Sequence, residues 1–194
     1  MRVPLVGGVP QQILEAGGVW NYQCARLPAT LCIYSPTDAN VQRFFAFDPD
    51  TGARHEITSA RVDAGPERPN WSLSPDGSRL ATSALRTDGD AAVQVLSFSD
   101  GSRTTILLKG WPRTGGIDWA SDGKSLWIAA SKSRANGPRN CSLLNVPVGG
   151  ATRVMFEDDG LCFLAGIPSP DGRHLALEGV RPDSSNVWLL EMSD

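Results

Sequence analysis

The chain has 194 residues, of which 41% are hydrophobic and 20% charged, and its formal net charge is −3. This composition indicates a globular protein with one sizeable core and excludes a disordered chain. The slight acidic excess disfavours nucleic-acid binding, and no apolar run has the length of a membrane span. Because there are 20 glycines and 14 prolines, we expect many turns and no long helices.

The chain begins with two short apolar runs, RVPLV and VPQQIL, on either side of Gly7-Gly8. Similar pairs of runs flank Thr51-Gly52, Asp100-Gly101 and Gly149-Gly150, so this pattern returns every 44 to 49 residues. Two strand-length apolar runs around a glycine-containing turn are typical of a β-hairpin. We therefore expect outer-strand pairs at these places, with the second strands around Ile13, Ile57, Ile106 and Val154.

A second turn alternates with the first along the chain. Ser-Pro-Asp-Gly at 74–77 and 169–172 suits a type I turn, because proline presets φ at the second position and glycine suits the fourth. Residues 121–123 keep only Asp-Gly of this motif, and residues 27–30, Leu-Pro-Ala-Thr, keep neither the aspartate nor the glycine. Each turn precedes an apolar strand-length run, which starts at Leu31, Leu80, Leu126 or Leu175.

Each repeat of 46 to 49 residues thus contains two hairpins, hence four strands, which we call a to d. Self-similarity at this period indicates the blades of a β-propeller. We predict an all-β chain with a single propeller domain over residues 1–194. Its four WD-like, four-stranded blades cover about residues 17–60, 66–110, 113–157 and 161–194, and residues 1–15 supply extra outer strands.

At these residues the chain resembles the TolB-type, WD-like β-propeller repeat. The motif is an apolar residue or Trp, then Ser-Pro-Asp-Gly, then a basic residue and an aliphatic strand, and it is best kept at 71–80 and 166–175. CARLPATLCIYS, IDWASDGKSLWIA and the ending GIPSPDGRHLALEGVRPDSSNVWLLE also resemble the C-terminal propellers of bacterial regulators. A eukaryotic-like serine/threonine kinase or a winged-helix domain precedes the propeller in such regulators. The resemblance implies a sensor or interaction module and supplies no catalytic residue.

Two arrangements of the blades remain open. If VPQQIL pairs with the last strand, NVWLLE, a four-bladed ring closes without an open edge. RVPLV would then duplicate NVWLLE, which favours an arc cut from a larger propeller of six to eight blades. An open arc would expose strand edges and favour self-association.

We expect no enzymatic activity, cofactor or metal. The chain lacks the Gly-x-Ser-x-Gly, kinase and Walker motifs, and its His and Cys residues lack metal-ligand spacing. His55 and His174 are interpreted as surface residues at strand starts. The recurring Asp76, Asp122 and Asp171 are interpreted as turn formers.

The four cysteines lead to two different expectations. Cys24 and Cys32 flank the degenerate turn of the first blade and are disulfide candidates, with two buried free thiols as the alternative. Cys32 aligns with Ala81, which leaves the pair one residue out of register. Cys141 and Cys162 lie in different strands, and we expect them to stay unpaired.

Binding is expected on the rim that the d–a and b–c loops build. These loops are residues 58–69, 109–116, 157–165, 86–91, 131–140 and 179–185. The candidate binding residues are Arg61, Glu67, Arg68, Trp111, Arg113, Arg134, Arg139, Asp158 and Asp159. Their mixed charge suggests a protein or peptide partner, without nucleic acid or direct membrane insertion.

Three functions follow from this interpretation. The first is a sensor or scaffold propeller at the C-terminal end of a bacterial signalling regulator. The second is a stand-alone periplasmic Tol-associated scaffold, and the third is an accessory propeller of a prolyl-oligopeptidase-type peptidase. We expect an extracytoplasmic location if the propeller belongs to a membrane-anchored regulator, and a cytoplasmic one otherwise. A Cys24–Cys32 disulfide would support the former.

Overall fold

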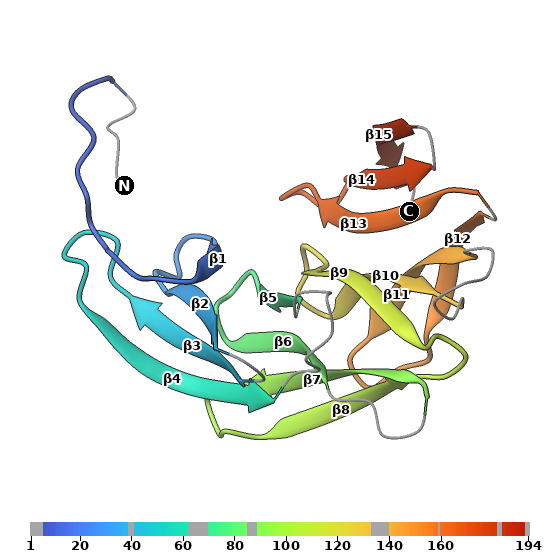
Figure 1. The fold of residues 1–194 in the computed structure, drawn as a ribbon, viewed down its shortest axis with the longest axis horizontal. Coiled ribbons are helices and arrows are strands. Elements are labelled where there is room, and N and C mark those ends of the chain that lie inside the picture. The colour runs from blue at the N-terminus through green and yellow to red at the C-terminus, as the bar shows by residue number, and fades with distance from the viewer. Residues whose placement is uncertain are drawn as a thin grey trace.

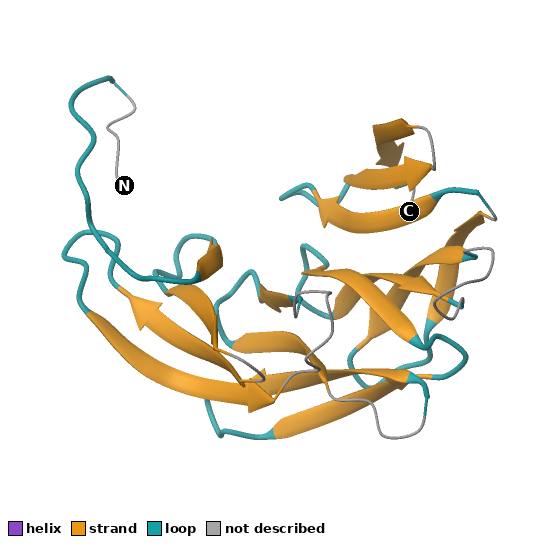
Figure 2. Cartoon of the chain, in the orientation of Figure 1, coloured by secondary structure: helices purple, strands orange, loops and turns teal. Residues whose placement is uncertain are grey.

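A computed structural model of the chain describes residues 6–38, 41–61, 70–84, 89–132, 140–158, 160–181 and 184–192. The side chains of Trp20, Thr37, Asp38 and Arg61 lie outside this description. Strands and connecting turns make up the described residues, and they contain no helix (Figure 2). The expected all-β class is therefore confirmed.

The strands form four antiparallel sheets in chain order. The first sheet is β1 (Val19–Cys24), β2 (Cys32–Asp38), β3 (Val41–Phe47) and β4 (Arg54–Arg61). The second is β5 (Trp71–Leu73), β6 (Arg79–Ala84), β7 (Ala91–Ser97) and β8 (Arg103–Leu108). The third is β9 (Arg113–Trp119), β10 (Ser125–Ser131), β11 (Cys141–Pro147) and β12 (Arg153–Asp158). The fourth is β13 (Cys162–Pro168), β14 (His174–Arg181) and β15 (Ser184–Glu191).

The four sheets are the blades of a propeller, and we number them in chain order. They follow one another around a common centre (Figure 1). The first strand of each blade lies innermost, since β1 contacts β5, β5 contacts β9, and β9 contacts β13. The predicted four-bladed propeller arrangement is confirmed.

Blade 4 differs from the prediction because its sheet contains three described strands rather than four. The strand expected around Ile13 is not formed: residues 6–18 contain a single bridge, at Gln11, and no strand. This segment runs along blade 1 instead, where Arg54 Nη1 donates a hydrogen bond to the Glu15 carbonyl at 3.1 Å. Pro10 also removes one backbone donor from the run. The ring is therefore not closed by pairing this segment with β15.

The a–b turns of blades 2, 3 and 4 share one geometry. The amides of Gly77, Gly123 and Gly172 each donate to the carbonyl three residues earlier, at 2.9 to 3.0 Å. All three glycines have positive φ, between 68° and 74°, a conformation that side chains disfavour. A type I turn followed by a left-handed glycine explains why glycine recurs there.

The recurring aspartates form these turns, as predicted. Oδ1 of each carboxylate accepts a hydrogen bond from the backbone amide two residues later, at 2.9 to 3.1 Å. These three residues are Asp76, Asp122 and Asp171.

The corresponding turn of blade 1 is one residue longer. Cys24 pairs directly with Cys32, just as Leu73 pairs with Leu80 in blade 2. Cys32, rather than Leu31, is therefore the counterpart of Leu80, and the sequence alignment of this blade was wrong by one residue. Because the two cysteines lie directly opposite each other, with Cα atoms 4.0 Å apart, they form the disulfide that we had considered.

The core lies between the blades. Along β10, Leu126 and Ile128 pack toward blade 2, whereas Trp127 and Ala129 pack toward blade 4. Such a strand is buried on both faces, which explains the continuous apolar sequence LWIAA. Each fully buried aliphatic side chain contributes roughly 1.5 to 3 kcal/mol, so packing between blades is the main stabilising contact of the fold.

Candidate binding rim

The predicted binding rim consists of the b–c loops within each blade and the d–a connections between blades. The structure describes only part of this rim. Glu67, Arg68, Arg134, Arg139 and Asp159, together with the side chain of Arg61, lie outside the described residues. Strands extend into several predicted loops, since β4 reaches residue 61 and β9 begins at residue 113. Trp111, Arg113 and Asp158 are the candidates whose side chains can be placed.

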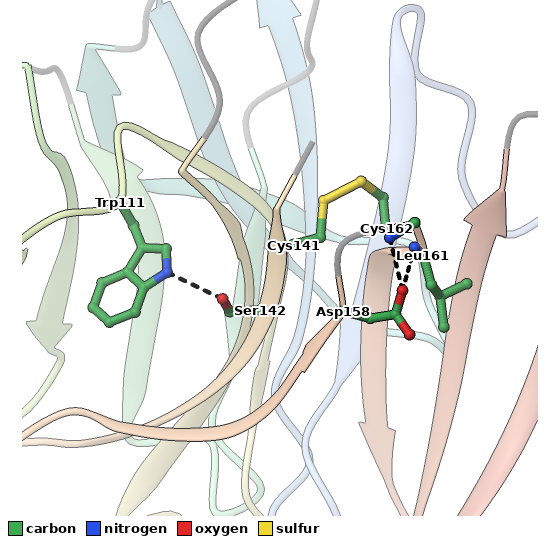
Figure 3. The surroundings of a disulfide bond; sticks show 7 residues. Trp111, Cys141, Ser142, Asp158, Leu161 and Cys162 are labelled. Atoms are coloured by element: carbon green, nitrogen blue, oxygen red, sulfur yellow. Dashed lines mark hydrogen bonds between the residues drawn. A yellow bond between two sulfur atoms is a disulfide. The ribbon is translucent and has the colours of Figure 1, made fainter. Parts of the chain in front are cut away.

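Trp111 lies in the short connection between β8 and β9. Its amide donates to the Leu108 carbonyl at 3.0 Å, and its carbonyl accepts from the Ala91 amide at 2.7 Å. The half-buried ring packs on the core between blades 2 and 3. Its Nε1 donates to Ser142 Oγ at 3.3 Å, so the indole bridges the two blades (Figure 3).

A charged side chain lies next to this indole and pairs with a second one. Lys132 Nζ is 5.8 Å from the centroid of the Trp111 ring and 2.6 Å from Glu157 Oε1. Both charged side chains are roughly 40% exposed, so they combine a cation–π contact with an ion pair that solvent reaches. We call Trp111, Lys132 and Glu157 the rim cluster.

Sequence reasoning missed two members of the rim cluster. Lys132 and Glu157 both fall inside loops that were predicted for the rim, but arginines and aspartates were chosen there instead. The signal that could have identified them is position, since Lys132 follows β10 directly and Glu157 precedes the end of β12.

Asp158 shapes the connection from blade 3 to blade 4. Its Oδ1 accepts hydrogen bonds from the amides of Gly160 and Leu161, both at 2.8 Å (Figure 3). The bond from Gly160 is the main reason that the pKa of Asp158 lies below its usual value. The carboxylate therefore fixes the entry into β13. Arg113 lies at the start of β9, opposite Ser131 of β10.

A disulfide joins blades 3 and 4 at this rim. Cys141 begins β11 and Cys162 begins β13, with Cα atoms 4.9 Å apart (Figure 3). The expectation that these cysteines stay unpaired was wrong. Their strands belong to different sheets, so a hairpin alignment within one repeat gives no sign that they meet.

A second polar group lies near the axis of the propeller. Ser72 Oγ of β5 donates to Asp118 Oδ1 of β9 at 3.0 Å. Burial raises the pKa of Asp118, and it outweighs the hydrogen bonds from Ser72 and the Trp119 amide and the charge of Arg26. This carboxylate links the inner strands of blades 2 and 3.

Arg26 joins three blades at the a–b end of the molecule. Its amide donates to the Pro75 carbonyl of blade 2 at 2.7 Å. Its Nη1 donates to the Pro170 carbonyl of blade 4 at 3.1 Å. Blades 1 and 4 therefore touch at their a–b turns near the axis.

Neither a metal site nor a membrane helix is present in the described part of the chain. No three His, Cys, Asp or Glu side chains gather there in a way that could hold a metal ion. None of the described residues belongs to a helix long and apolar enough to cross a bilayer.

Solved structures with the same blade arrangement include two TolB proteins. The chain matches TolB from Acinetobacter baumannii with a TM-score of 0.65 and 19% identity, over 88% of this chain and 41% of that one. It matches putative TolB from Agrobacterium tumefaciens with a TM-score of 0.66 and 17% identity, over 87% and 60%. The fold is that of a TolB-like β-propeller. The chain spans less than two thirds of the length of these TolB proteins.

The same propeller fold occurs in a peptidase. Prolyl oligopeptidase B from Galerina marginata matches with a TM-score of 0.61 and 15% identity, over 89% of this chain and 29% of that one. No protein-family model and no curated protein matches the chain. At these identities the similarity establishes the TolB-like fold alone.

Proposed function

We propose that the chain is a non-catalytic propeller scaffold that binds a protein or peptide through its rim. The rim cluster carries this proposal. It places a half-buried indole beside a cation, which pairs with an anion, and both charged side chains are open to solvent. Aromatic residues are enriched at protein interfaces, and charged groups around them set specificity more than affinity.

The surroundings of the rim cluster hold it in place. The Trp111 indole is bonded to Ser142, the Lys132 amide donates to the Asn140 carbonyl at 3.0 Å, and the Cys141–Cys162 disulfide ties the neighbouring blade. A preorganised surface binds more tightly because less conformational entropy is lost on association.

The two disulfides favour a location in an oxidising compartment, because cytosolic thiols are kept reduced. An extracytoplasmic sensor or scaffold, as part of a bacterial signalling regulator, fits both this location and the TolB-like fold. The fold is equally compatible with a stand-alone Tol-associated scaffold, which an export signal in the gene would favour.

Selection of random peptides displayed on phage against the full chain tests the proposal. We expect peptides that bind the wild-type chain to lose at least tenfold in affinity against Lys132→Glu, because this change reverses the charge beside Trp111. They should also be recovered uncleaved, as mass spectrometry of the bound peptide can show.

Lys124→Glu is the matched control for this experiment. Lys124 is an exposed lysine of the same blade, but it lies on the a–b turn, at the other end of β10. Peptides that bind Lys132→Glu and Lys124→Glu equally well, or that bind neither of these variants, would contradict a binding site at the rim cluster.

A further inference from the structure

The two ends of the propeller expose sheet faces that the inner blades bury. We call the surface of blade 1 that points away from blade 2 the leading face. The surface of blade 4 that points away from blade 3 is the trailing face. In Figure 1 these blades lie at the two ends of the row of sheets.

The trailing face exposes apolar side chains of β15. Val187 of β15 is 74% exposed and lies opposite Glu178 of β14. The strand register makes it the counterpart of Val93 in blade 2 and Leu143 in blade 3, both of which are 0% exposed. Leu189, two residues further along β15, is 69% exposed. These side chains occupy positions that a following blade covers elsewhere in the molecule.

The leading face of blade 1 also exposes a side chain that is buried at the same position in blades 2 and 3. Tyr22 of β1 is 68% exposed and lies opposite Tyr34 of β2. Its counterparts by register are Trp71 of blade 2 and Ile117 of blade 3, which are 4% and 5% exposed. In blades 2 and 3, the preceding blade covers these two counterparts. The same side of blade 1 contains an open pocket of about 880 Å³, whose lining includes Cys24, Leu27, Cys32, Phe47 and Arg54.

Two further features of the chain concern strand pairing: the outer edge of β15, and residues 9–14, which resemble a strand in sequence. Among the described strands, β15 pairs with β14 alone, so β15 lies at the edge of its sheet. Residues 9–14 follow Gly7-Gly8 as β12 follows Gly149-Gly150, yet they form no strand. Val9 in this segment is 83% exposed.

We propose that a second copy of this chain covers the trailing face. In the complete blades, strand d leads directly into strand a of the next blade, as β8 leads into β9. Residues 9–14 of a second copy can pair with β15 of the first copy. Blade 1 of the second copy then follows blade 4 of the first, and its leading face meets the first copy's trailing face. One partner then supplies both the missing strand and the missing apolar cover. The contact joins two different surfaces, head to tail.

The contact between Arg26 and Pro170 involves neither of the two exposed faces. It joins blades 1 and 4 at their a–b turns, whereas Tyr22 and Val187 remain exposed in the same structure. Further blades from a longer chain, or pairing of two trailing faces with each other, are the competing occupants.

Light scattering of the full chain over a concentration series tests the proposal. We expect the mass of two or more chains for the wild type. Val187→Lys with Leu189→Lys should give single chains, because it places two charges in the trailing face, and Tyr22→Lys should do the same from the leading face. An equimolar mixture of the two variants should again form a one-to-one complex, since each keeps the face that the other lacks.

Met155→Lys is the control. Met155 is 53% exposed on β12, which belongs to a complete blade, so this variant should associate like the wild type. All substituted side chains are exposed, and circular dichroism checks that the blades stay folded. A wild-type chain that is single at every concentration would overturn the proposal and favour further blades. A Tyr22→Lys chain that still associates would overturn it in favour of pairing between trailing faces.

Discussion

At the scale of single residues, the aspartate of the a–b turn links the repeat motif to stability. Asp76 accepts hydrogen bonds from the Ser74 and Ser78 hydroxyls and from the Ser78 amide. Partial burial opposes ionisation, but these bonds outweigh it and lower the pKa of Asp76 to about 2. A carboxyl group with a lowered pKa stabilises the folded state above its unfolded pKa, and this contribution disappears as the pH falls toward 2.

We therefore expect Asp76→Ala to destabilise the chain at pH 7 and to lose this effect near pH 2. Because the carboxylate is exposed to solvent, the loss at pH 7 should be about 1 kcal/mol, less than the full linkage value. Urea unfolding of both proteins across this pH range measures the difference.

Asp122→Ala is the comparison for this prediction. The turn of blade 3 has Ala120 in place of Ser74, so it lacks the hydroxyl that bonds the carboxylate in blade 2. Asp122→Ala should therefore lower the free energy of unfolding by less than Asp76→Ala does. An Asp76→Ala effect that stays constant from pH 7 to pH 2 would contradict the assigned role of the charge.

At the scale of strands, the Cys141–Cys162 disulfide is the covalent link between two sheets. It closes a loop of 21 residues, whereas Cys24–Cys32 closes one of 8 within a single hairpin. A cross-link stabilises mainly by restricting the unfolded chain, and the effect grows slowly with loop length.

Replacing Cys141 and Cys162 together by alanine should lower the free energy of unfolding by about 3 kcal/mol. Replacing Cys24 and Cys32 should cost somewhat less, because the loop is shorter. Denaturant unfolding, with a thiol count on the same samples, measures both losses. Equal stability of the first variant and the wild type would show that this link does not hold blade 4.

Prediction from sequence succeeded where structure is local. Ser74, Pro75, Asp76 and Gly77 specify their turn through short-range geometry, and three of the four expected d strands form. It failed for contacts between repeats, since nothing within one blade shows that Cys141 meets Cys162. The strand expected around Ile13 also failed, because forming a strand requires a free edge nearby as well as a suitable pattern.

The same limit applied to the rim. Trp111 was predicted from its place in a connection, and the structure brings it together with Lys132. That neighbour follows β10, which pairs with β9 so that Ser131 lies opposite Arg113. The connection that precedes β9 therefore places Trp111 beside Lys132, and this contact depends on a register between strands that local patterns leave open.

At the scale of the whole molecule, the blades are also joined across the axis. Arg26 of blade 1 donates to the Pro75 carbonyl through its amide and to the Pro170 carbonyl through its guanidinium. Only the second bond depends on the side chain. The guanidinium group of Arg26 therefore couples the blades at the two ends of the chain.

Arg26→Ala should loosen the a–b turn of blade 4 while blades 2 and 3 keep their protection. Hydrogen exchange of the Gly172 amide, which bonds the Ser169 carbonyl, should become several-fold faster, because local opening is governed by the contacts that hold a segment. Arg173→Ala removes the same charge within blade 4 itself and should leave this amide's exchange close to the wild-type rate. Unchanged exchange in Arg26→Ala would show that the coupling carries no stability.

The turns at the two ends of a blade differ in what surrounds them. Gly77 lies against Ala25, Gly123 against Arg79, and Gly172 against Ser121, so each a–b turn touches its neighbour. Gly101 and Gly149, at the c–d turns of blades 2 and 3, have open space where a side chain would begin, whereas Gly52 in blade 1 lies against Ile13. Insertions and deletions during evolution should therefore collect at the c–d turns of blades 2 and 3, whereas a change in one a–b turn requires a compensating change in the next blade.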